Sequence, residues 1–113
     1  MGHNRALGAH GEARAARWYE AQGFEVLDRN WRCRDGELDL VARRGDLVVI
    51  CEVKTRTSDA FGHPEAAVGH AKRKRIRRLA ARYLAETGRH SGEVRFDVVA
   101  ITGPNVEVFE DAF

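Results

Sequence analysis

The chain has 113 residues, 43% hydrophobic and 32% charged, with a formal net charge of +2, which fits a single globular domain spanning 1–113. No apolar run approaches the roughly 20 residues that cross a bilayer, and the start at Met1–Arg5 leads into no signal segment, so we expect a cytoplasmic protein without a membrane partner. The two cysteines, Cys33 and Cys51, are too few for a disulfide scaffold or a four-cysteine zinc site.

Hydrophobic periodicity divides the chain into two helices and five strands. A first helix is expected because the segment before Gly23 is rich in alanine and its small and aromatic residues recur at spacings of three and four. Gly23 is expected to end this helix. The expected elements in chain order are a helix over 5–22, strands over 24–31, 36–43 and 47–55, a polar loop over 57–64, a helix over 65–86, and strands over 94–101 and 106–109.

The order of these elements, α-β-β-β-α-β-β, predicts an α/β fold. Three consecutive strands form a meander, and the helix that follows the third strand allows the fourth strand to lie parallel to it. We therefore expect a mixed five-stranded sheet flanked by helices.

The hairpin formed by the second and third strands brings acidic residues together. If Gly45-Asp46 is a two-residue turn, Asp39 lies opposite Glu52 and Glu37 lies opposite Lys54. The purely apolar residues of both strands then share the other face. A three-residue turn would instead place Asp39 on the apolar face, so the clean separation of the faces favours the two-residue turn.

These pairings suggest a metal site. Facing Cβ atoms lie about 4.5–5.5 Å apart, so the carboxylates of Asp39 and Glu52 would repel one another unless a cation lay between them. A hard divalent cation such as Mg²⁺ or Mn²⁺ would relieve this repulsion. Lys54 follows on the same face and could orient a water or stabilise a pentavalent phosphate.

The alternative to this interpretation is an ordinary solvated sheet face. For Glu37 and Lys54 an exposed ion pair is the better interpretation. For Asp39 the alternative is weaker, because it lies between Leu38 and Leu40 in a hydrophobic strand. Glu52 likewise follows an apolar run, and an unpaired buried charge is costly.

The second predicted helix is strongly basic, with seven Lys or Arg residues and no acid between Glu65 and Glu86. Such a block favours a surface that binds a polyanion, although a solvated face remains the better interpretation for any single arginine. Lys72 lies four residues before Ile76, on the inward side. The candidate nucleic-acid contacts are Lys72, Lys74, Arg75, Arg78 and, at the end of the third strand, Arg56.

Asp97 interrupts the apolar fourth strand. Two interpretations stay open for it: a supporting partner of Lys54 or Arg56 at the site, or the acid of a structural ion pair.

Several motifs together resemble a known pattern. Asp39, twelve further residues and then Glu52-Val53-Lys54 resemble the D…(D/E)-x-K core of the restriction-endonuclease-like superfamily. The other motifs are Gly8-x-x-Gly11-Glu12, Gly23-Phe24, Arg29-Asn30-Trp31-Arg32, Gly36-Glu37-Leu38-Asp39-Leu40-Val41, Thr55-Arg56, Arg95-Phe96-Asp97-Val98-Val99 and Asp111-Ala112-Phe113. Over nearly the whole chain, the sequence resembles the YraN-like family of bacterial proteins.

The resemblance implies a fold similar to that of archaeal Holliday-junction resolvases. It implies that Asp39, Glu52 and the backbone carbonyl of Val53 bind a metal ion, and that Lys54 is the catalytic lysine. It also implies that Glu12, which lies among small residues of the first helix, belongs to the metal site; the alternative for Glu12 is an ordinary surface residue.

The leading hypothesis is a metal-dependent endonuclease that hydrolyses phosphodiester bonds in branched or structured DNA, with DNA named by analogy alone. The first alternative is a nucleic-acid-binding module without turnover, because Leu38 replaces the proline of the superfamily's Pro-Asp pair. A protein-interaction role is the second alternative, and the intact Asp39, Glu52 and Lys54 argue against it. A homodimer would let two sites cut both strands of a duplex, and the sequence leaves both a monomer and a homodimer open.

Overall fold

The computed structural model describes residues 2–56, 68–89 and 92–113, with side chains from His10 onward. Its elements are α1 (Gly2–Ala21), β1 (Glu25–Cys33), β2 (Gly36–Arg44), β3 (Leu47–Arg56), α2 (His70–Thr87), β4 (Glu93–Thr102) and β5 (Asn105–Phe109). The predicted order is confirmed. Helix α2 begins later than expected because Gly69 has an extended backbone, with φ −71° and ψ 169°. The expected loop over 57–64 and the expected helical residues 65–67 lie outside the described residues.

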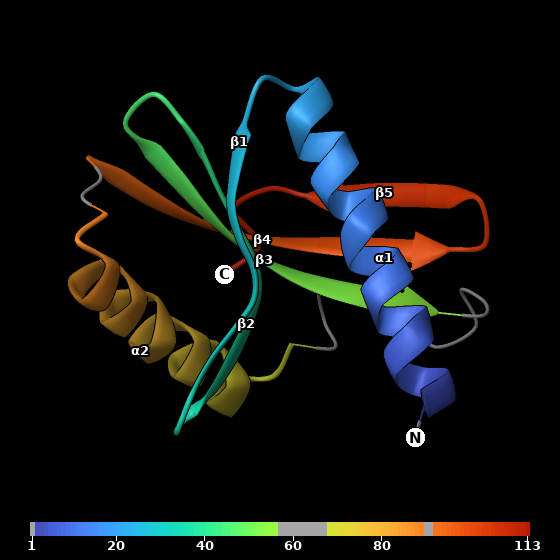
Figure 1. Ribbon diagram of the computed structural model, residues 1–113, viewed down its shortest axis with the longest axis horizontal. Coiled ribbons are helices and arrows are strands. Elements are labelled where there is room, and N and C mark those ends of the chain that lie inside the picture. The colour runs from blue at the N-terminus through green and yellow to red at the C-terminus, as the bar shows by residue number, and fades with distance from the viewer. Residues whose placement is uncertain (1, 57–67, 90–91) are drawn as a thin grey trace.

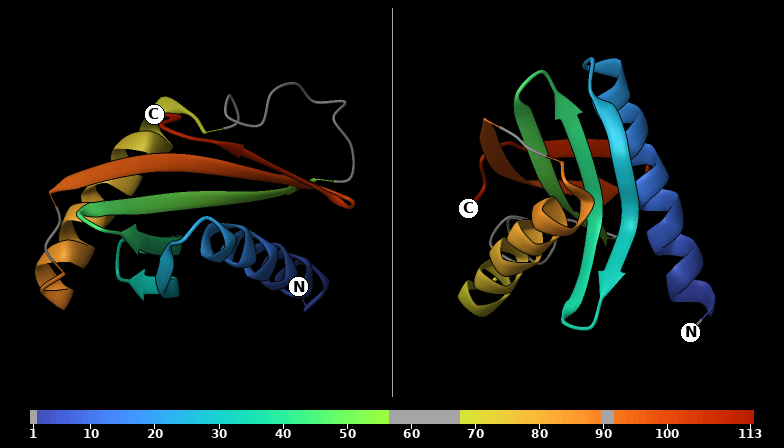
Figure 2. Two further views of the ribbon diagram at one scale, coloured as in Figure 1. Left: turned by 90° about the horizontal axis from the view of Figure 1, so that it is seen from above. Right: turned by 60° about the vertical axis from the view of Figure 1, so that its left-hand side comes forward.

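The five strands form one sheet in the order β1-β2-β3-β4-β5 (Figure 1). Strands β3 and β4 are parallel and the other neighbours are antiparallel, as the crossover through α2 predicts. Helices α1 and α2 lie on opposite faces of this sheet (Figure 2). Within the described ranges, the helices lack the combination of length and apolar character that crossing a bilayer requires.

The predicted hairpin register is confirmed. Arg44 pairs with Leu47 and Leu40 pairs with Cys51, which leaves Gly45-Asp46 as a two-residue turn. Gly45 has a φ of 60°, the left-handed conformation that such turns require.

Both faces of the sheet are buried, each beneath one helix. The cluster beneath α1 contains Tyr19, Leu40, Ala42, Val49 and Cys51, among other residues. The cluster beneath α2 contains Leu38, Val41, Ile50, Ile76 and Leu79, among other residues. The sheet therefore lies between two hydrophobic layers.

The expectation that Leu38 and Leu40 share one face is wrong, because the alternation of β2 is interrupted at Asp39. Leu38 packs beneath α2 and Leu40 beneath α1. The interruption falls opposite Asn30, whose φ of 52° breaks the regular pleat of β1.

Helix α1 approaches β3 closely at Gly11. A Cβ atom at this position would overlap the hydroxyl of Thr55, so only glycine allows the observed distance between helix and strand. The next residue, Glu12, is thereby held near the carboxyl-terminal half of β3.

Candidate active site

Strands β2 and β3 diverge at the candidate site. Within the described strands their ladder ends at the pair Leu40–Cys51. Beyond it, the Asp39 carboxylate accepts a hydrogen bond of 2.8 Å from the Val53 backbone N–H. Asp39 thus satisfies a donor that β2 no longer reaches, which fixes its carboxylate beside Glu52 and Val53.

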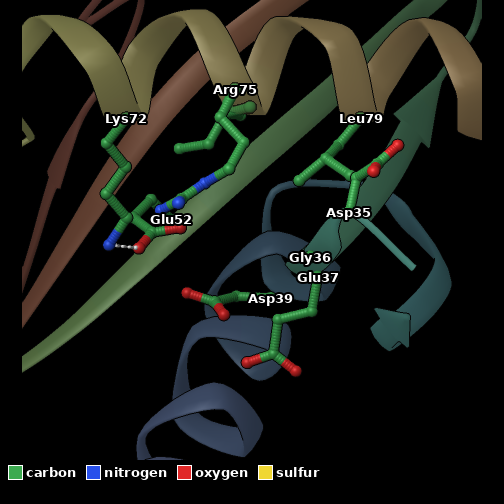
Figure 3. A pocket seen from close by; sticks show the side chains of 9 residues that line it. Asp35, Gly36, Glu37, Asp39, Glu52, Lys72, Arg75 and Leu79 are labelled. Carbon is green, nitrogen blue, oxygen red and sulfur yellow. Dashed lines mark ion pairs between the residues drawn. The ribbon is translucent and has the colours of Figure 1, made fainter. Parts of the chain in front are cut away.

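Glu52 is held by two lysines. Its side chain is 10% exposed, and one of its oxygens, Oε1, lies 2.5 Å from Lys72 Nζ and 3.7 Å from Lys54 Nζ. Lys72 reaches this carboxylate from α2, across the pocket from Asp39 (Figure 3). The inward position expected for Lys72 is confirmed, but its contact is with a carboxylate.

The expected ion pair between Glu37 and Lys54 is wrong. Glu37 lies opposite Arg32 on β1 and forms an ion pair of 2.9 Å with it. The reason is the divergence of the hairpin, which leaves β1 as the only strand that pairs with β2 at Glu37 in the described sheet.

A pocket of about 350 Å³ opens between β2, β3 and α2. Its lining residues are Asp35, Gly36, Glu37, Asp39, Glu52, Lys72, Arg75, Ile76 and Leu79. Acidic groups come from β2, β3 and, in the case of Asp35, the turn before β2, whereas the basic groups come from α2 (Figure 3). This volume is within the range of small-ligand sites.

Burial and mutual repulsion perturb the carboxylates. Burial, followed by the charge of Glu52, raises the pKa of Asp39 to about 7, although the hydrogen bond from Val53 opposes the shift. Burial also raises the pKa of Glu12, against a hydrogen bond from Asn30. The charge of Glu52 also raises the Glu12 pKa, and the charge of Glu12 raises the Asp39 pKa, so Glu12 lies close enough to interact electrostatically with the site.

Lys54 is the more easily deprotonated of the two lysines. Burial lowers its pKa, and the adjacent Lys72 ammonium lowers it further. Burial opposes the charge on Lys72 as well, but the Glu52 carboxylate offsets this and raises the Lys72 pKa. The site thus contains one well-compensated ammonium and one that is predisposed to lose its proton.

The oxygen donors fit a hard divalent cation that keeps part of its water shell. Among the residues that the structure describes, no three His, Cys, Asp or Glu side chains are already gathered into a metal-binding group. Mg²⁺, however, is commonly bound through one or two carboxylates with water completing its coordination. Asp39 and Glu52 supply two such carboxylates, and after burial the charge of Glu52 is the next cause of the raised Asp39 pKa.

The basic residues of α2 divide into two sets. Arg73 and Arg77 stack over the rings of Phe96 and Phe113, and Arg82 pairs with Asp35 and Glu86. The candidate contacts Lys74, Arg75 and Arg78 are exposed, and they form no ion pair with the described part of the chain. Arg75 also lines the pocket.

Arg56 lies apart from the pocket that contains Glu52. It lines a second pocket, of about 360 Å³, together with His10, Arg14 and Thr55. The structure therefore does not bring Arg56 and Lys72 to one surface hollow.

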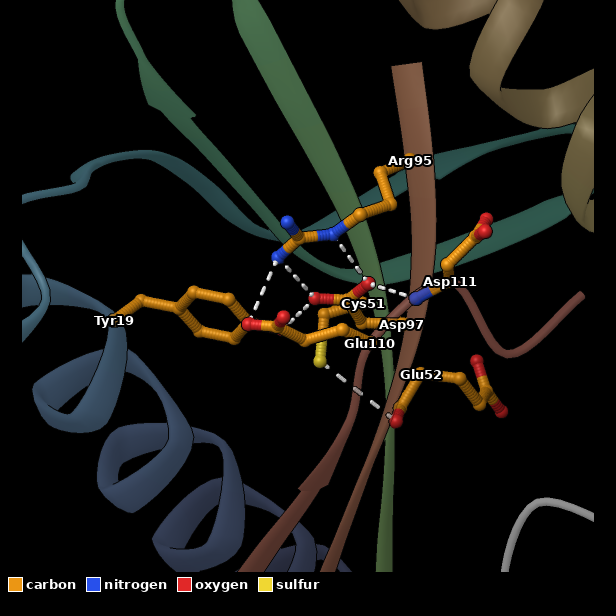
Figure 4. A network of polar contacts seen from close by, with 7 residues as sticks. All are labelled: Tyr19, Cys51, Glu52, Arg95, Asp97, Glu110 and Asp111. Atoms are coloured by element: carbon orange, nitrogen blue, oxygen red, sulfur yellow. Dashed lines mark hydrogen bonds and ion pairs between the residues drawn. The ribbon is translucent and has the colours of Figure 1, made fainter.

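Asp97 has the contacts of a structural ion pair, the second of its two interpretations. It is completely buried and accepts two hydrogen bonds of 2.9 Å from Arg95 and one of 2.6 Å from the Tyr19 hydroxyl (Figure 4). The Asp111 backbone N–H donates a further bond of 2.9 Å. Asp97 therefore links α1, β4 and the residues after β5. These contacts favour the structural ion pair over a supporting role beside Lys54 or Arg56.

Sequence reasoning missed the contribution of Asn30. Its hydrogen bond to Glu12 and its left-handed backbone lie beside the point where β2 twists. The available signal was the residue type, since asparagine adopts this conformation more readily than most residues.

Comparison with known sequences places the chain in a family. A family model described as "Uncharacterised protein family UPF0102" matches residues 11–101. The chain belongs to the UPF0102 family. A UPF0102 protein of Beutenbergia cavernae is 64% identical over 96 residues, which cover 85% of this chain and 81% of that relative.

Other UPF0102 relatives match most or all of the chain. One from Rhodococcus jostii is 52% identical over 118 aligned positions that cover all of both proteins. Another, from Frankia casuarinae, is 55% identical over 100 residues, covering 88% of this chain and 85% of the relative. The expected membership of a bacterial family is confirmed, and because the UPF0102 name states no reaction, the activity has to come from the site itself.

Proposed function

We propose that this UPF0102 protein is a metal-dependent endonuclease of the restriction-endonuclease-like superfamily, similar to archaeal Holliday-junction resolvases, acting on structured or branched DNA. The observation that carries the proposal is the position of Asp39, Glu52 and Lys54 where β2 diverges from β3. The pocket beside Asp39 and Glu52 is also lined by the half-buried Lys72 and the exposed Arg75. The choice of DNA, and of a branched form, rests on the sequence resemblance.

Asp39 and Glu52 would hold Mg²⁺ or Mn²⁺, with the Val53 carbonyl and Glu12 as further candidates. The metal, when bound, would polarise the phosphate and lower the pKa of a bound water. Val53 has a second task that needs no metal, because its N–H fixes the Asp39 carboxylate.

Lys54 would handle the proton of the attacking water. Burial and the adjacent Lys72 lower the Lys54 pKa, which favours its neutral form relative to an ordinary lysine. In its charged form it can instead stabilise the developing charge on phosphate oxygens. Both roles require it to lie on the Glu52 side of β3, where the structure has it at 3.7 Å from the carboxylate.

The test combines metal binding and cleavage. Wild type, Asp39→Asn and the control Glu107→Gln, an exposed position on β5, are titrated with Mn²⁺ and followed by thermal unfolding. We expect stabilisation of the wild type and the control but not of Asp39→Asn, and metal-dependent cutting of a branched DNA by the same two proteins. Cutting that survives Asp39→Asn would refute the assigned site.

A nucleic-acid-binding role without turnover is the second candidate. It is favoured by the Lys72 contact, which neutralises Glu52 without a metal. It predicts that Lys74→Glu/Arg78→Glu weakens salt-sensitive binding of DNA, whereas Arg17→Glu/Arg29→Glu, a matched reversal at exposed positions of α1 and β1, does not. Equal binding by both double variants would contradict it.

A further inference from the structure

Two ammonium groups converge on one carboxylate oxygen at the site. Glu52 Oε1 lies 2.5 Å from Lys72 Nζ and 3.7 Å from Lys54 Nζ. The Glu52 side chain is 10% exposed and that of Lys72 is 32% exposed, so the contact is largely screened from water. Lys72 therefore supplies a positive charge at the place where a metal ion would contact Glu52.

The position of Lys72 on α2 is unfavourable apart from this contact. It lies in the first turn of the helix, which contains no acidic residue, and Gly69 before it provides no side-chain cap. The amino-terminal end of a helix is electropositive and disfavours a cation. The Glu52 carboxylate is the group that compensates Lys72 there.

A metal ion and Lys72 cannot use this oxygen together without cost. A divalent cation binds carboxylate oxygen at about 2.0–2.1 Å in the case of Mg²⁺. An ammonium at 2.5 Å from the same oxygen would then lie close to a doubly charged ion, and like charges at this separation repel strongly. A metal ion that binds Oε1 must therefore move Lys72 away from Glu52 or turn the carboxylate, whereas one that bound only Oε2 would leave the Lys72 contact in place.

We propose that Lys72 is a positioning residue that occupies the metal-binding carboxylate in the metal-free protein and is displaced when a divalent cation binds. This inference rests on the proposed function, because it takes Glu52 to be a metal ligand. Once displaced, Lys72 remains at the pocket that it lines, in the first turn of α2, with Lys54 close to Glu52 on β3. Two ammonium groups and a helix N-terminus favour a phosphate group, so metal binding would create the anion-binding state of the pocket.

Calorimetric titration with Mn²⁺ tests the competition directly. Wild type is compared with Lys72→Met and with the control Arg17→Met, which removes an exposed cation of α1. We expect Lys72→Met to bind Mn²⁺ about tenfold more tightly, which corresponds to about 1.4 kcal/mol. The control should bind as the wild type does, because Arg17 lies outside the pocket that contains Glu52.

A metal-free measurement accompanies the titration. In a double-mutant cycle, Lys72→Met should lower the unfolding temperature in the wild-type background but not in the Glu52→Gln background. Additive effects would overturn the contact on which the inference depends.

The outcomes separate the two proposals. Mn²⁺ binding that is unchanged or weaker in Lys72→Met overturns the displacement of Lys72 and leaves the metal site standing. An absence of Mn²⁺ binding in all three proteins overturns both the inference and the proposed metal site.

Discussion

Replacing Asp39 by asparagine should change how stability depends on pH. The substitution keeps an oxygen that accepts the Val53 N–H but removes the charge. In the folded protein the Asp39 pKa is raised from its usual 3.8 to about 7, chiefly by burial. Between these two values the folded state binds more protons than the unfolded state, so the stability of the wild type falls as pH rises through this window.

The size of this effect follows from the interval between the two pKa values. An interval from 3.8 to about 7 corresponds to about 4 kcal/mol at 1.36 kcal/mol per pH unit. Because the side chain is half-buried and its charge is partly screened by water, we expect roughly 2 kcal/mol. Asp39→Asn should therefore gain about 2 kcal/mol on the wild type between pH 4 and pH 8.

Urea unfolding of the wild type and Asp39→Asn at several pH values in that range, without divalent metal, measures the gain. Glu107→Gln, an exposed carboxylate on β5, serves as the matched control. Its stability should follow that of the wild type throughout. Parallel pH profiles for the wild type and Asp39→Asn would show that Asp39 is not a perturbed carboxyl, and the argument for excess negative charge at the site would fail.

Two further predictions concern the contacts that hold the site in place. Gly11→Ala should destabilise the fold by about 1–3 kcal/mol in urea unfolding, because its Cβ overlaps the Thr55 hydroxyl, and adding Thr55→Ala should recover most of the loss; a double variant no more stable than Gly11→Ala would contradict this. Asp97→Asn should cost about 3–5 kcal/mol in thermal unfolding, since it leaves the Arg95 guanidinium without its buried partner. A loss as small as that of an exposed ion pair would show that the Asp97 network contributes little.

The hairpin that carries Asp39 and Glu52 could be predicted because its determinants are local. A two-residue turn at Gly45-Asp46 fixes the register of both strands, and the register brings the two carboxylates to the same end of the hairpin. The parallel pairing of β3 with β4 follows in the same way from the intervening helix.

The contacts that were not predicted depend on residues far apart in the sequence. The face of Leu38 depends on the backbone of Asn30 in another strand. Lys72 reaches Glu52 because α2 packs on the sheet with its first turn beside Glu52, a position that the local sequence does not determine. From the sequence, Glu37 could pair with Arg32 on one neighbouring strand or with Lys54 on the other. It pairs with Arg32 because β2 and β3 diverge before they reach Glu37 and Lys54.

The parallel pairing of the two central strands has a consequence for synthesis of the chain. Strand β3, with its apolar run Leu47–Cys51, is complete at Arg56, but its neighbour β4 is complete only at Thr102. At typical translation rates this interval lasts roughly 2–9 s, during which one edge of β3 has no partner strand. An unpaired apolar strand edge is prone to join another chain, so the nascent protein passes through an aggregation-prone stage that the finished sheet does not reveal.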